Sequence, residues 1–171
     1  MFRYGDPQYR SRVFVTAVKT DLVLNEFPVA THGGDKKDKN GNMLPGVVTC
    51  SDALGDLEKV TPVSGNGLVE LQREDGTSYF VKDHASSGTG LKSDMVQLKR
   101  DEPSNTIIRK SNVKHYSLHR TLTLREQARL QSLPDDFEFN GARGLIISGI
   151  GNAVPVLTST EVAKSIKSSY R

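Results

Sequence analysis

Residues 120–137 read RTLTLREQARLQSLPDDF and contain the strongest structural signal in the chain. Thr123 and Glu126 have the spacing of a capping box, in which the hydroxyl accepts a hydrogen bond from the third helical amide and the carboxylate reaches back to the cap. The pattern therefore predicts a helix that begins after Thr123 and stops before Pro134. We expect its inward face to carry Leu124, Ala128, Leu130 and Leu133, with Arg125 and Arg129 on another face.

The segment from residue 145 onward predicts an extended entry, a glycine turn and a final helix. Residues 145–148 are apolar, residues 149–155 read GIGNAVP, and residues 156–170 place Val162, Ala163, Ile166 and Tyr170 on one helical stripe that must dock on another surface. Backbone amides of a glycine turn can approach a ligand closely, as in nucleotide-binding loops. An ordinary helix-entry turn fits the same residues, because the third glycine of the dinucleotide-binding fingerprint is absent.

Residues 12–18, RVFVTAV, form an apolar run rich in β-branched residues. This run predicts a strand buried on both faces, and such strands belong to sheets covered by helices, which makes the fold class α/β. In the extended stretch before it, the two-residue period places Gln8, Arg10 and Arg12 on one side, so that two guanidiniums project together. A surface strand that carries arginines is the alternative interpretation.

The middle of the chain contains shorter signals. Residues 33–42 predict a surface loop, and residues 68–72 and 77–82 predict an antiparallel hairpin around an Asp-Gly turn. We also expect short strands at 47–49 and 105–109 and one or two helical turns at 51–57. Cys50, the only cysteine, has no prolyl neighbour, helix start or nearby cation to activate it, so we expect it to be a packing residue.

Composition bounds the class of protein. The 171 residues suit one domain, and 36% hydrophobic with 25% charged residues indicates a soluble, folded chain rather than a membrane protein. The start of the sequence lacks the apolar core of a signal peptide, so we expect an intracellular protein, nuclear in a eukaryote and in the cytoplasm or nucleoid of a bacterium. A single cysteine excludes an intramolecular disulfide and a thiolate zinc cluster.

Charge is concentrated in the middle of the chain. Residues 99–129 hold eight basic and three acidic residues, whereas the whole chain has a net charge of only +3. A basic stretch that also contains His115, Tyr116 and His119 is typical of contact with a phosphate backbone. A solvated surface face is the alternative. The residues that we select for DNA contact are Arg109, Lys110, Lys114 and Arg120.

Three blocks of the sequence resemble, in order, blocks of the DNA (cytosine-5) methyltransferases. Residues 8–14, QYRSRVF, resemble the family's Gln-x-Arg-x-Arg block, commonly numbered motif VIII. Residues 120–137 resemble motif IX almost throughout, and residues 151–155, GNAVP, resemble motif X. Residues 102–107 also resemble the segment that leads into motif IX, so the resemblance spans the whole chain.

The resemblance implies a cofactor domain, a smaller target-recognition domain inserted between motifs VIII and IX, and DNA in the cleft between them. Members flip the target cytosine out of the duplex, attack its ring with a cysteine thiolate and methylate it from S-adenosylmethionine. By position, Arg12 corresponds to the arginine that hydrogen-bonds the flipped base, with Arg10 beside it. Asn152, Ala153 and Val154 correspond to the loop over the cofactor. Arg125, Glu126, Arg129 and Gln131 correspond to residues that organise the recognition domain.

Several family parts are absent from this sequence, namely the Phe-x-Gly-x-Gly cofactor loop, the Pro-Cys nucleophile and the Glu-Asn-Val block. Cys50 follows the arginine block instead of preceding it, so we do not assign it the nucleophile's role. The Cys-Phe-Thr signature of the tRNA-methylating relatives is also missing, which favours DNA over RNA.

We therefore expect the carboxy-terminal portion of a DNA cytosine-5 methyltransferase, either truncated or one subunit of a split enzyme. Its fold would be a partial S-adenosylmethionine-dependent, Rossmann-like α/β fold with a small, mostly β recognition region. Residues 1–60 would hold the last catalytic strands, 61–118 the recognition region, and 119–171 motifs IX and X. The expected partners are DNA and the amino-terminal half of the enzyme, and we expect no contact with a membrane. Without the amino-terminal half, the chain would neither use S-adenosylmethionine nor methylate DNA. The alternatives are a non-catalytic DNA-binding or regulatory module and a functionless relic.

Overall fold

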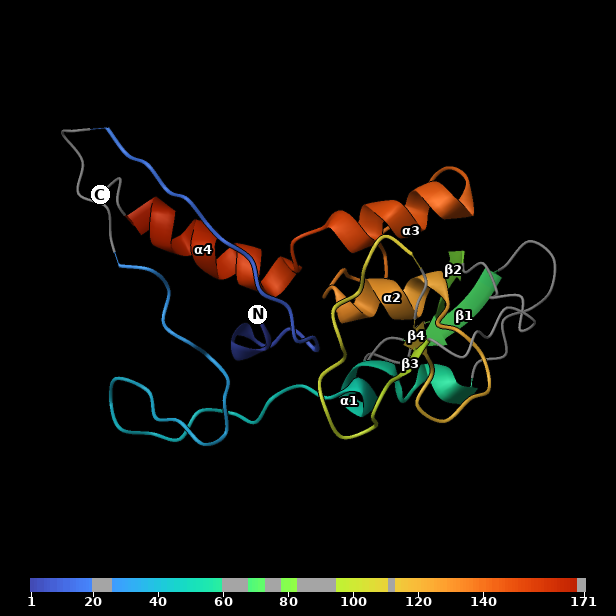
Figure 1. Ribbon diagram of the computed structural model, residues 1–171, viewed down its shortest axis with the longest axis horizontal. Coiled ribbons are helices and arrows are strands. Elements are labelled where there is room, and N and C mark those ends of the chain that lie inside the picture. The colour runs from blue at the N-terminus through green and yellow to red at the C-terminus, as the bar shows by residue number, and fades with distance from the viewer. Residues whose placement is uncertain (20–25, 60–67, 73–77, 83–94, 111–112, 169–171) are drawn as a thin grey trace.

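The computed structural model describes residues 1–19, 26–59, 68–72, 78–82, 95–110 and 113–168. Its elements in chain order are η1 (Phe2–Tyr4), α1 (Cys50–Leu54), η2 (Leu57–Lys59), β1 (Leu68–Gln72), β2 (Ser78–Lys82), β3 (Val96–Gln97), β4 (Val113–Lys114), α2 (Leu124–Leu130), α3 (Arg143–Asn152) and α4 (Val156–Ser168). Figure 1 shows α1, α2, α3 and the strands grouped in one body, with α4 and the amino-terminal segment extending from it.

Helix α2 lies at the centre of the hydrophobic core and contacts both α1 and α3. Thr123 caps it with both hydrogen bonds of the predicted capping box, so the predicted start of this helix is confirmed. Leu124, Ala128 and Leu130 are buried in the core and Leu133 packs against it, which confirms the predicted inward face. The neighbouring Arg125, Glu126 and Gln127 are buried as well. The helix is therefore enclosed on nearly all sides. Arg125 donates to the carbonyls of Pro134 and Phe137 and Glu126 accepts from Arg120, whereas Gln127 Oε1 has no hydrogen-bond partner among the described residues.

Helix α3 replaces the predicted extended entry and glycine turn. Residues 143–152 continue as one helix through Gly149 and Gly151, because Ile146, Ile147 and Ile150 share a face that packs into the core. The chain then bends at residues 153–155, and α4 begins at Val156, where the final helix was predicted.

The strands form two small sheets. Strands β1 and β2 pair antiparallel, with Leu68 opposite Lys82, which confirms the predicted hairpin. Strands β3 and β4 pair in parallel over two residues each. Within the described ranges this pair and a single Gln8–Ser104 bridge are the only parallel pairings, so these ranges contain no broad Rossmann-like sheet.

Two short predicted strands are absent, since their backbones have other partners. Thr49 caps α1 in a capping box with Asp52, so residues 47–49 lead into a helix, the helix predicted at 51–57. At residues 105–109 the amide and carbonyl of Ile107 bond to the side chains of Gln8 and Arg10. These bonds replace the ladder that a strand would need.

Residues 11–19 are extended but form no strand, and the prediction of burial on both faces is wrong. Val13 is 90% exposed and Val15 is 91% exposed. In the view of Figure 1 this segment is drawn along α4, away from the strands β1–β4. A run of β-branched residues becomes a buried strand only when a neighbouring strand takes up its backbone groups, and the described residues supply none here.

Helix α4 docks on the amino-terminal part of the chain. Val162 is buried and Ile166 is half-buried, Ala163 is exposed, and the fourth predicted stripe residue, Tyr170, lies outside the described residues. The Ser165 hydroxyl donates to the Glu26 carbonyl at 2.8 Å. Among the described residues no single helix is long and apolar enough to cross a membrane, and α3 and α4 meet that criterion only as a pair bent by 44°.

Candidate functional site

The side chain of Gln8 joins three segments of the chain inside the core. It is fully buried, and its Nε2 donates to the Leu130 carbonyl at 2.8 Å and to Gln131 Oε1 at 3.2 Å. Its Oε1 accepts a hydrogen bond of 2.9 Å from the Ile107 amide. Donor and acceptor of one amide side chain are thus both used, which fixes residues 8, 107 and 130–131 relative to one another.

Arg10 extends this connection to the end of α3. Its guanidinium is buried and donates to the carbonyls of Ile107 at 2.6 Å and Gly151 at 2.8 Å, and to Gln8 Oε1 at 3.4 Å. Burial, and secondarily the charge of Arg12, lowers the pKa of Arg10 to about 10. Among the described residues no carboxylate pairs with this buried cation. Within these residues only carbonyl oxygens accept hydrogen bonds from it, and burying a cation without a carboxylate partner costs free energy.

Gly151 permits a very close approach between α3 and the segment that Arg10 also holds. A Cβ at position 151 would lie 2.4 Å from the Ile108 carbonyl carbon and 2.5 Å from the Arg109 amide nitrogen. The glycine therefore serves packing between two backbones, which neither sequence interpretation, an approach to a ligand or an ordinary helix-entry turn, anticipated. Gln131 supports the same junction, since its Nε2 donates to the Ile150 carbonyl at 2.7 Å.

Asp6 fixes the start of α4. Its buried carboxylate accepts hydrogen bonds from the Ser132 hydroxyl at 2.7 Å, from the Thr158 amide at 3.1 Å, and from the Thr158 hydroxyl. A carboxylate at the first turn of a helix is favoured by the helix dipole. Sequence reasoning missed Asp6, although its place in the Tyr-Gly-Asp-Pro turn before Gln8 was a usable signal.

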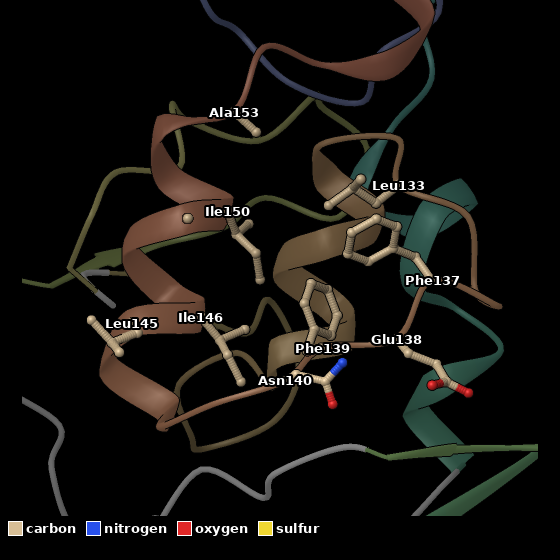
Figure 2. A pocket seen from close by; sticks show the side chains of 10 residues that line it. Leu133, Phe137, Glu138, Phe139, Asn140, Leu145, Ile146, Ile150 and Ala153 are labelled. Atoms are coloured by element: carbon tan, nitrogen blue, oxygen red, sulfur yellow. The ribbon is translucent and has the colours of Figure 1, made fainter.

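An open apolar cavity of about 440 Å³ lies between α3 and the loop that follows α2 (Figure 2). Phe137, Phe139 and Ile146 point into it, and Ala153 stands at one end. Glu138 and Asn140 are the polar members of the lining. Its chemistry suits a flat or aliphatic group more than a charged one.

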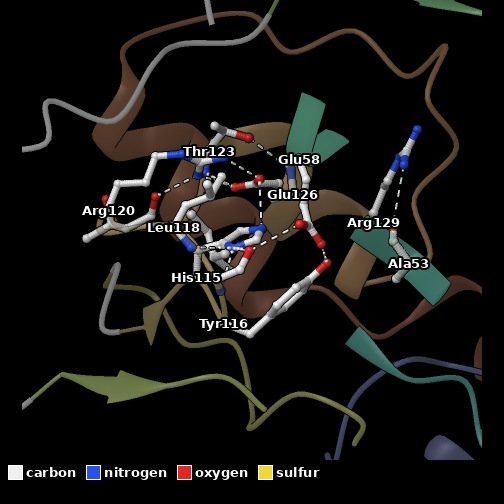
Figure 3. Close-up of polar contacts among 12 residues, drawn as sticks. Ala53, Glu58, His115, Tyr116, Leu118, Arg120, Thr123, Glu126 and Arg129 are labelled. Atoms are coloured by element: carbon white, nitrogen blue, oxygen red, sulfur yellow. Dashed lines mark hydrogen bonds and ion pairs between the residues drawn. The ribbon is translucent and has the colours of Figure 1, made fainter. Parts of the chain in front are cut away.

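On the other side of α2, a buried histidine organises the turn before the helix (Figure 3). His115 Nδ1 accepts from the amides of Ser117 and Leu118, both at 3.2 Å, so the ring proton resides on Nε2, which faces Glu126 Oε1 at 3.6 Å. Burial lowers the pKa of His115, and the Glu126 carboxylate only partly opposes that effect. Arg120 donates to both oxygens of Glu126 at 2.7 Å.

Two further polar contacts tie α1 and η2 to this region. Arg129 donates to Asp135 and Asp56 and to the Ala53 carbonyl at 3.2 Å. Burial opposes the charged form, but the two carboxylates raise the pKa of Arg129 above its ordinary value. The Tyr116 hydroxyl donates to Glu58, and burial together with this bond raises the pKa of Tyr116.

A family model of C-5 cytosine-specific DNA methylases matches residues 1–168. The chain belongs to the C-5 cytosine-specific DNA methylases. A type II methyltransferase of Neisseria gonorrhoeae, M.NgoFVII, is 36% identical over 95% of this chain and 46% of its own length. M.MthTI of Methanothermobacter thermautotrophicus is 33% identical over 96% of this chain and 53% of its own length. The methylase chain thus spans about half the length of these curated relatives.

A solved structure shares the fold of this methylase. The protein, described as a candidate DNA modification methyltransferase encoded within a prophage of E. coli, matches with a TM-score of 0.57 and 19% identity. The match covers 76% of this chain and 49% of that chain. The likeness supports a methyltransferase fold for this half-length chain.

The structure places the two predicted catalytic arginines of the methylase differently. Arg10 points into the core, whereas Arg12 is exposed and donates to the Ser11 carbonyl at 2.7 Å. The expected projection of both guanidiniums from one face is therefore wrong, because the chain leaves the body after residue 11. The three predicted cofactor residues follow directly on Gly151, with Asn152 and Val154 exposed and Ala153 half-buried.

The predicted DNA-contacting residues of the methylase fall into two groups. Arg109 and Lys110 are exposed beside α3, where Arg109 Nε donates to the Ser148 hydroxyl at 3.1 Å. Lys114 and Arg120 line a second, small cavity with His119. The Arg120 guanidinium is bound to Glu126, a structural role that its basic character alone did not reveal.

Cys50 is the first residue of α1, so the sequence interpretation that no helix start lies nearby is wrong. Burial, with a smaller effect of Glu102, nevertheless raises the pKa of its thiol to about 12. A thiol of this kind is almost entirely protonated at neutral pH and is a poor nucleophile. The expectation that Cys50 is a packing residue is confirmed by its complete burial in the core.

Proposed function

We propose that this chain supplies target recognition and part of the base and cofactor pockets of an enzyme that transfers a methyl group from S-adenosylmethionine to C5 of cytosine in DNA. The observation that carries the proposal is the Arg10–Gly151 hydrogen bond of 2.8 Å. It links the block that holds Arg12 to the block that holds Asn152. Arg12, assigned to the base by the family resemblance, and Asn152, assigned to the cofactor, therefore each lie within two residues of the same hydrogen bond.

In this mechanism Arg12 contacts the flipped cytosine. Its exposed guanidinium can donate oriented hydrogen bonds to the base and stabilise electron density that develops on the ring during thiolate attack. Arg10 acts as a positioning residue, because its three acceptors fix the backbone two residues before Arg12. The attacking thiolate comes from a Pro-Cys segment outside the residues of this sequence, since Cys50 is buried and protonated.

The residues near the end of α3 fit a cofactor with both polar and apolar parts. Asn152 offers an exposed amide, Ala153 lines one end of the cavity of Figure 2, and Val154, the next residue in the chain, has an exposed apolar side chain. These three residues would hold S-adenosylmethionine, which supplies the electrophilic methyl group when bound. The chain's own contribution is to orient that donor and to exclude water from it.

We further propose that residues 12–18 dock against a complementary polypeptide that carries the nucleophile and the cofactor loop. Val13 and Val15 are almost fully exposed, as is usual for a contact surface rather than for the surface of a monomer. Extended residues with open backbone groups can pair with an added strand. This docking would complete the α/β sheet that the described residues lack.

The test is reconstitution of methyl transfer from two polypeptides. The first complement is the polypeptide encoded directly upstream of this chain, and the second is the amino-terminal half of M.NgoFVII. Sedimentation first establishes assembly, and transfer of labelled methyl groups to duplex DNA is then measured. We expect no transfer by either part alone, transfer by the assembled pair, and a loss of about 10²-fold or more in Arg12→Ala.

Arg3→Ala is the matched control, because it removes another exposed arginine near the same terminus and leaves residues 8–12 intact. An assembled pair that binds DNA without transferring methyl groups would contradict the proposed enzyme and support the non-catalytic DNA-binding module. Equal activity of Arg12→Ala and the wild type would contradict only the role of Arg12 and would leave the proposed enzyme standing.

A further inference from the structure

A small polar cavity of about 100 Å³ lies between β4 and the turn that precedes α2. It is lined by Gln97, Lys114, Ser117, Leu118, His119 and Arg120. Cavities that hold whole small molecules are several times larger, so this one suits a single compact polar group. Three of its six lining residues are basic side chains, which favours an anionic group.

The turn around the cavity is held in shape by its own hydrogen bonds. The backbones of Lys114 and Thr121 form an isolated antiparallel β-bridge, and the His115 amide donates to the Arg120 carbonyl at 3.0 Å. Inside the turn, His115 Nδ1 accepts from the amides of Ser117 and Leu118 (Figure 3). The cavity is therefore preformed, and an anion would not have to order the loop on binding.

The basic side chains of the cavity have separate tasks. Arg120 is anchored by its two 2.7 Å bonds to Glu126, so its charge is balanced and its side chain forms a fixed wall. Lys114 Nζ and the His119 ring make no hydrogen bond or ion pair with any side chain in the described part of the chain. As far as the described residues are concerned, both side chains can therefore contact a ligand in the cavity.

The acidic groups nearby are already engaged. Glu126 pairs with Arg120 and faces His115, and Glu58 accepts from Tyr116 and from Ser117 at 3.2 Å. Arg100 also lies 3.9 Å from Glu58. The carboxylates that could repel an anion are thus turned toward other donors, which leaves the positive charge of Lys114 dominant at the cavity.

We infer that this cavity binds one phosphate group of the DNA backbone, with Lys114 and His119 as the ligand-contacting side chains. The inference rests on the proposed function, because the residue that contacts the flipped base and this cavity belong to one chain that would lie along DNA. Phosphate contacts of this kind set the position of a protein on the duplex without reading its sequence.

The first experiment titrates the purified chain with inorganic phosphate and follows the backbone amide resonances. We expect shifts confined to residues 97 and 114–120, against a chloride control of equal ionic strength. A second titration uses a short DNA duplex at several salt concentrations. Shifts with inorganic phosphate but no binding of duplex would overturn the assignment of the ligand to DNA.

Lys114→Gln and His119→Gln are the test variants, and Lys37→Gln, an exposed lysine on a different loop, is the charge-matched control. We expect Lys114→Gln to weaken duplex binding about tenfold on every sequence and to reduce the slope of log K against log salt by about 1. We expect His119→Gln to weaken it less, and Lys37→Gln to leave the slope unchanged. Equal slopes for Lys114→Gln and Lys37→Gln would overturn the inference.

The outcome is separable from that of the proposed function. Methyl transfer by the assembled enzyme with unchanged affinity in Lys114→Gln would refute the phosphate site and leave the enzyme standing. If inorganic phosphate shifts no amide resonance of the wild-type chain, the phosphate site is refuted. Misfolding of a variant cannot explain that result, because this titration uses the unaltered chain.

Discussion

The Arg10 guanidinium donates a 2.8 Å hydrogen bond to the carbonyl of Gly151, which lies 141 residues later in the chain. This bond and the Gln8 contacts bring residues 8, 10, 107, 130–131 and 150–151 into one buried polar junction. The junction is mostly built from side chains that bond to backbone groups. Its geometry therefore depends on a few side chains more than on regular secondary structure.

Arg10→Lys should lower the free energy of unfolding by about 2 kcal/mol. Lysine cannot reach two carbonyls with a planar fork, so at least one of the buried carbonyls of Ile107 and Gly151 loses its donor. Arg12→Lys is the matched control, and because Arg12 is exposed we expect a change within about 0.5 kcal/mol. Urea unfolding of the two variants measures both values, and equal losses would show that the buried fork is not important.

Gly151→Ala and Gly149→Ala should shift stability in opposite directions. A methyl group at position 151 would meet the Ile108 backbone at 2.4 Å, which should cost about 1–3 kcal/mol. At position 149 nothing lies within 4 Å of the added Cβ, and alanine in place of glycine within α3 should stabilise by about 0.5–1 kcal/mol. Thermal unfolding of the pair tests this, and a neutral Gly151→Ala would refute the close contact.

The thiol of Cys50 should be nearly inert in the folded protein. Because burial raises its pKa to about 12, alkylation by iodoacetamide at pH 8 should be far slower in buffer than in urea. The rate is followed by mass spectrometry of the intact chain. Labelling in buffer as fast as in urea would mean that α1 opens readily or that the thiol is exposed.

Stability should fall as the pH drops below about 6.5, the ordinary pKa of histidine. Burial lowers the pKa of His115 in the folded chain, so below that pH the unfolded chain binds more protons than the folded one. The stabilisation is present above the unfolded pKa and is lost as pH decreases, with a slope of at most about 1.4 kcal/mol per pH unit. Urea unfolding at pH 7.5 and 5.5 measures the difference.

His115→Gln should remove most of this pH dependence, since glutamine does not titrate. His119→Gln, which removes an exposed imidazole four residues away, is the control and should retain it. A pH dependence that persists unchanged in His115→Gln would assign the effect to other groups.

Features with local causes were predictable from the sequence. The start of α2 follows from Thr123 and Glu126, whose capping bonds join residues three apart. The β1–β2 pairing follows from alternation around an Asp-Gly turn, and α4 begins where Pro155 permits a first helical turn. In each case the residues that determine the element are neighbours in the chain.

The errors arise where distant residues determine the outcome. Residues 13–18 have the composition of a strand, but the described part of the chain offers them no neighbouring strand. Gly149 and Gly151 suggested a turn, yet packing of the α3 isoleucines on the core maintains a helix through both. The burial of Arg125 could not be seen either, because its acceptors are the carbonyls of Pro134 and Phe137.

The bare valines at positions 13 and 15 have a consequence for the life of the protein in a cell. Chaperones and proteases act on exposed apolar segments that no partner covers, and proteolysis removes such molecules irreversibly. On the proposal that a second polypeptide covers these residues, a copy without that polypeptide should be degraded faster than an assembled one. Turnover would in this way match the amounts of the two polypeptides without any dedicated regulator.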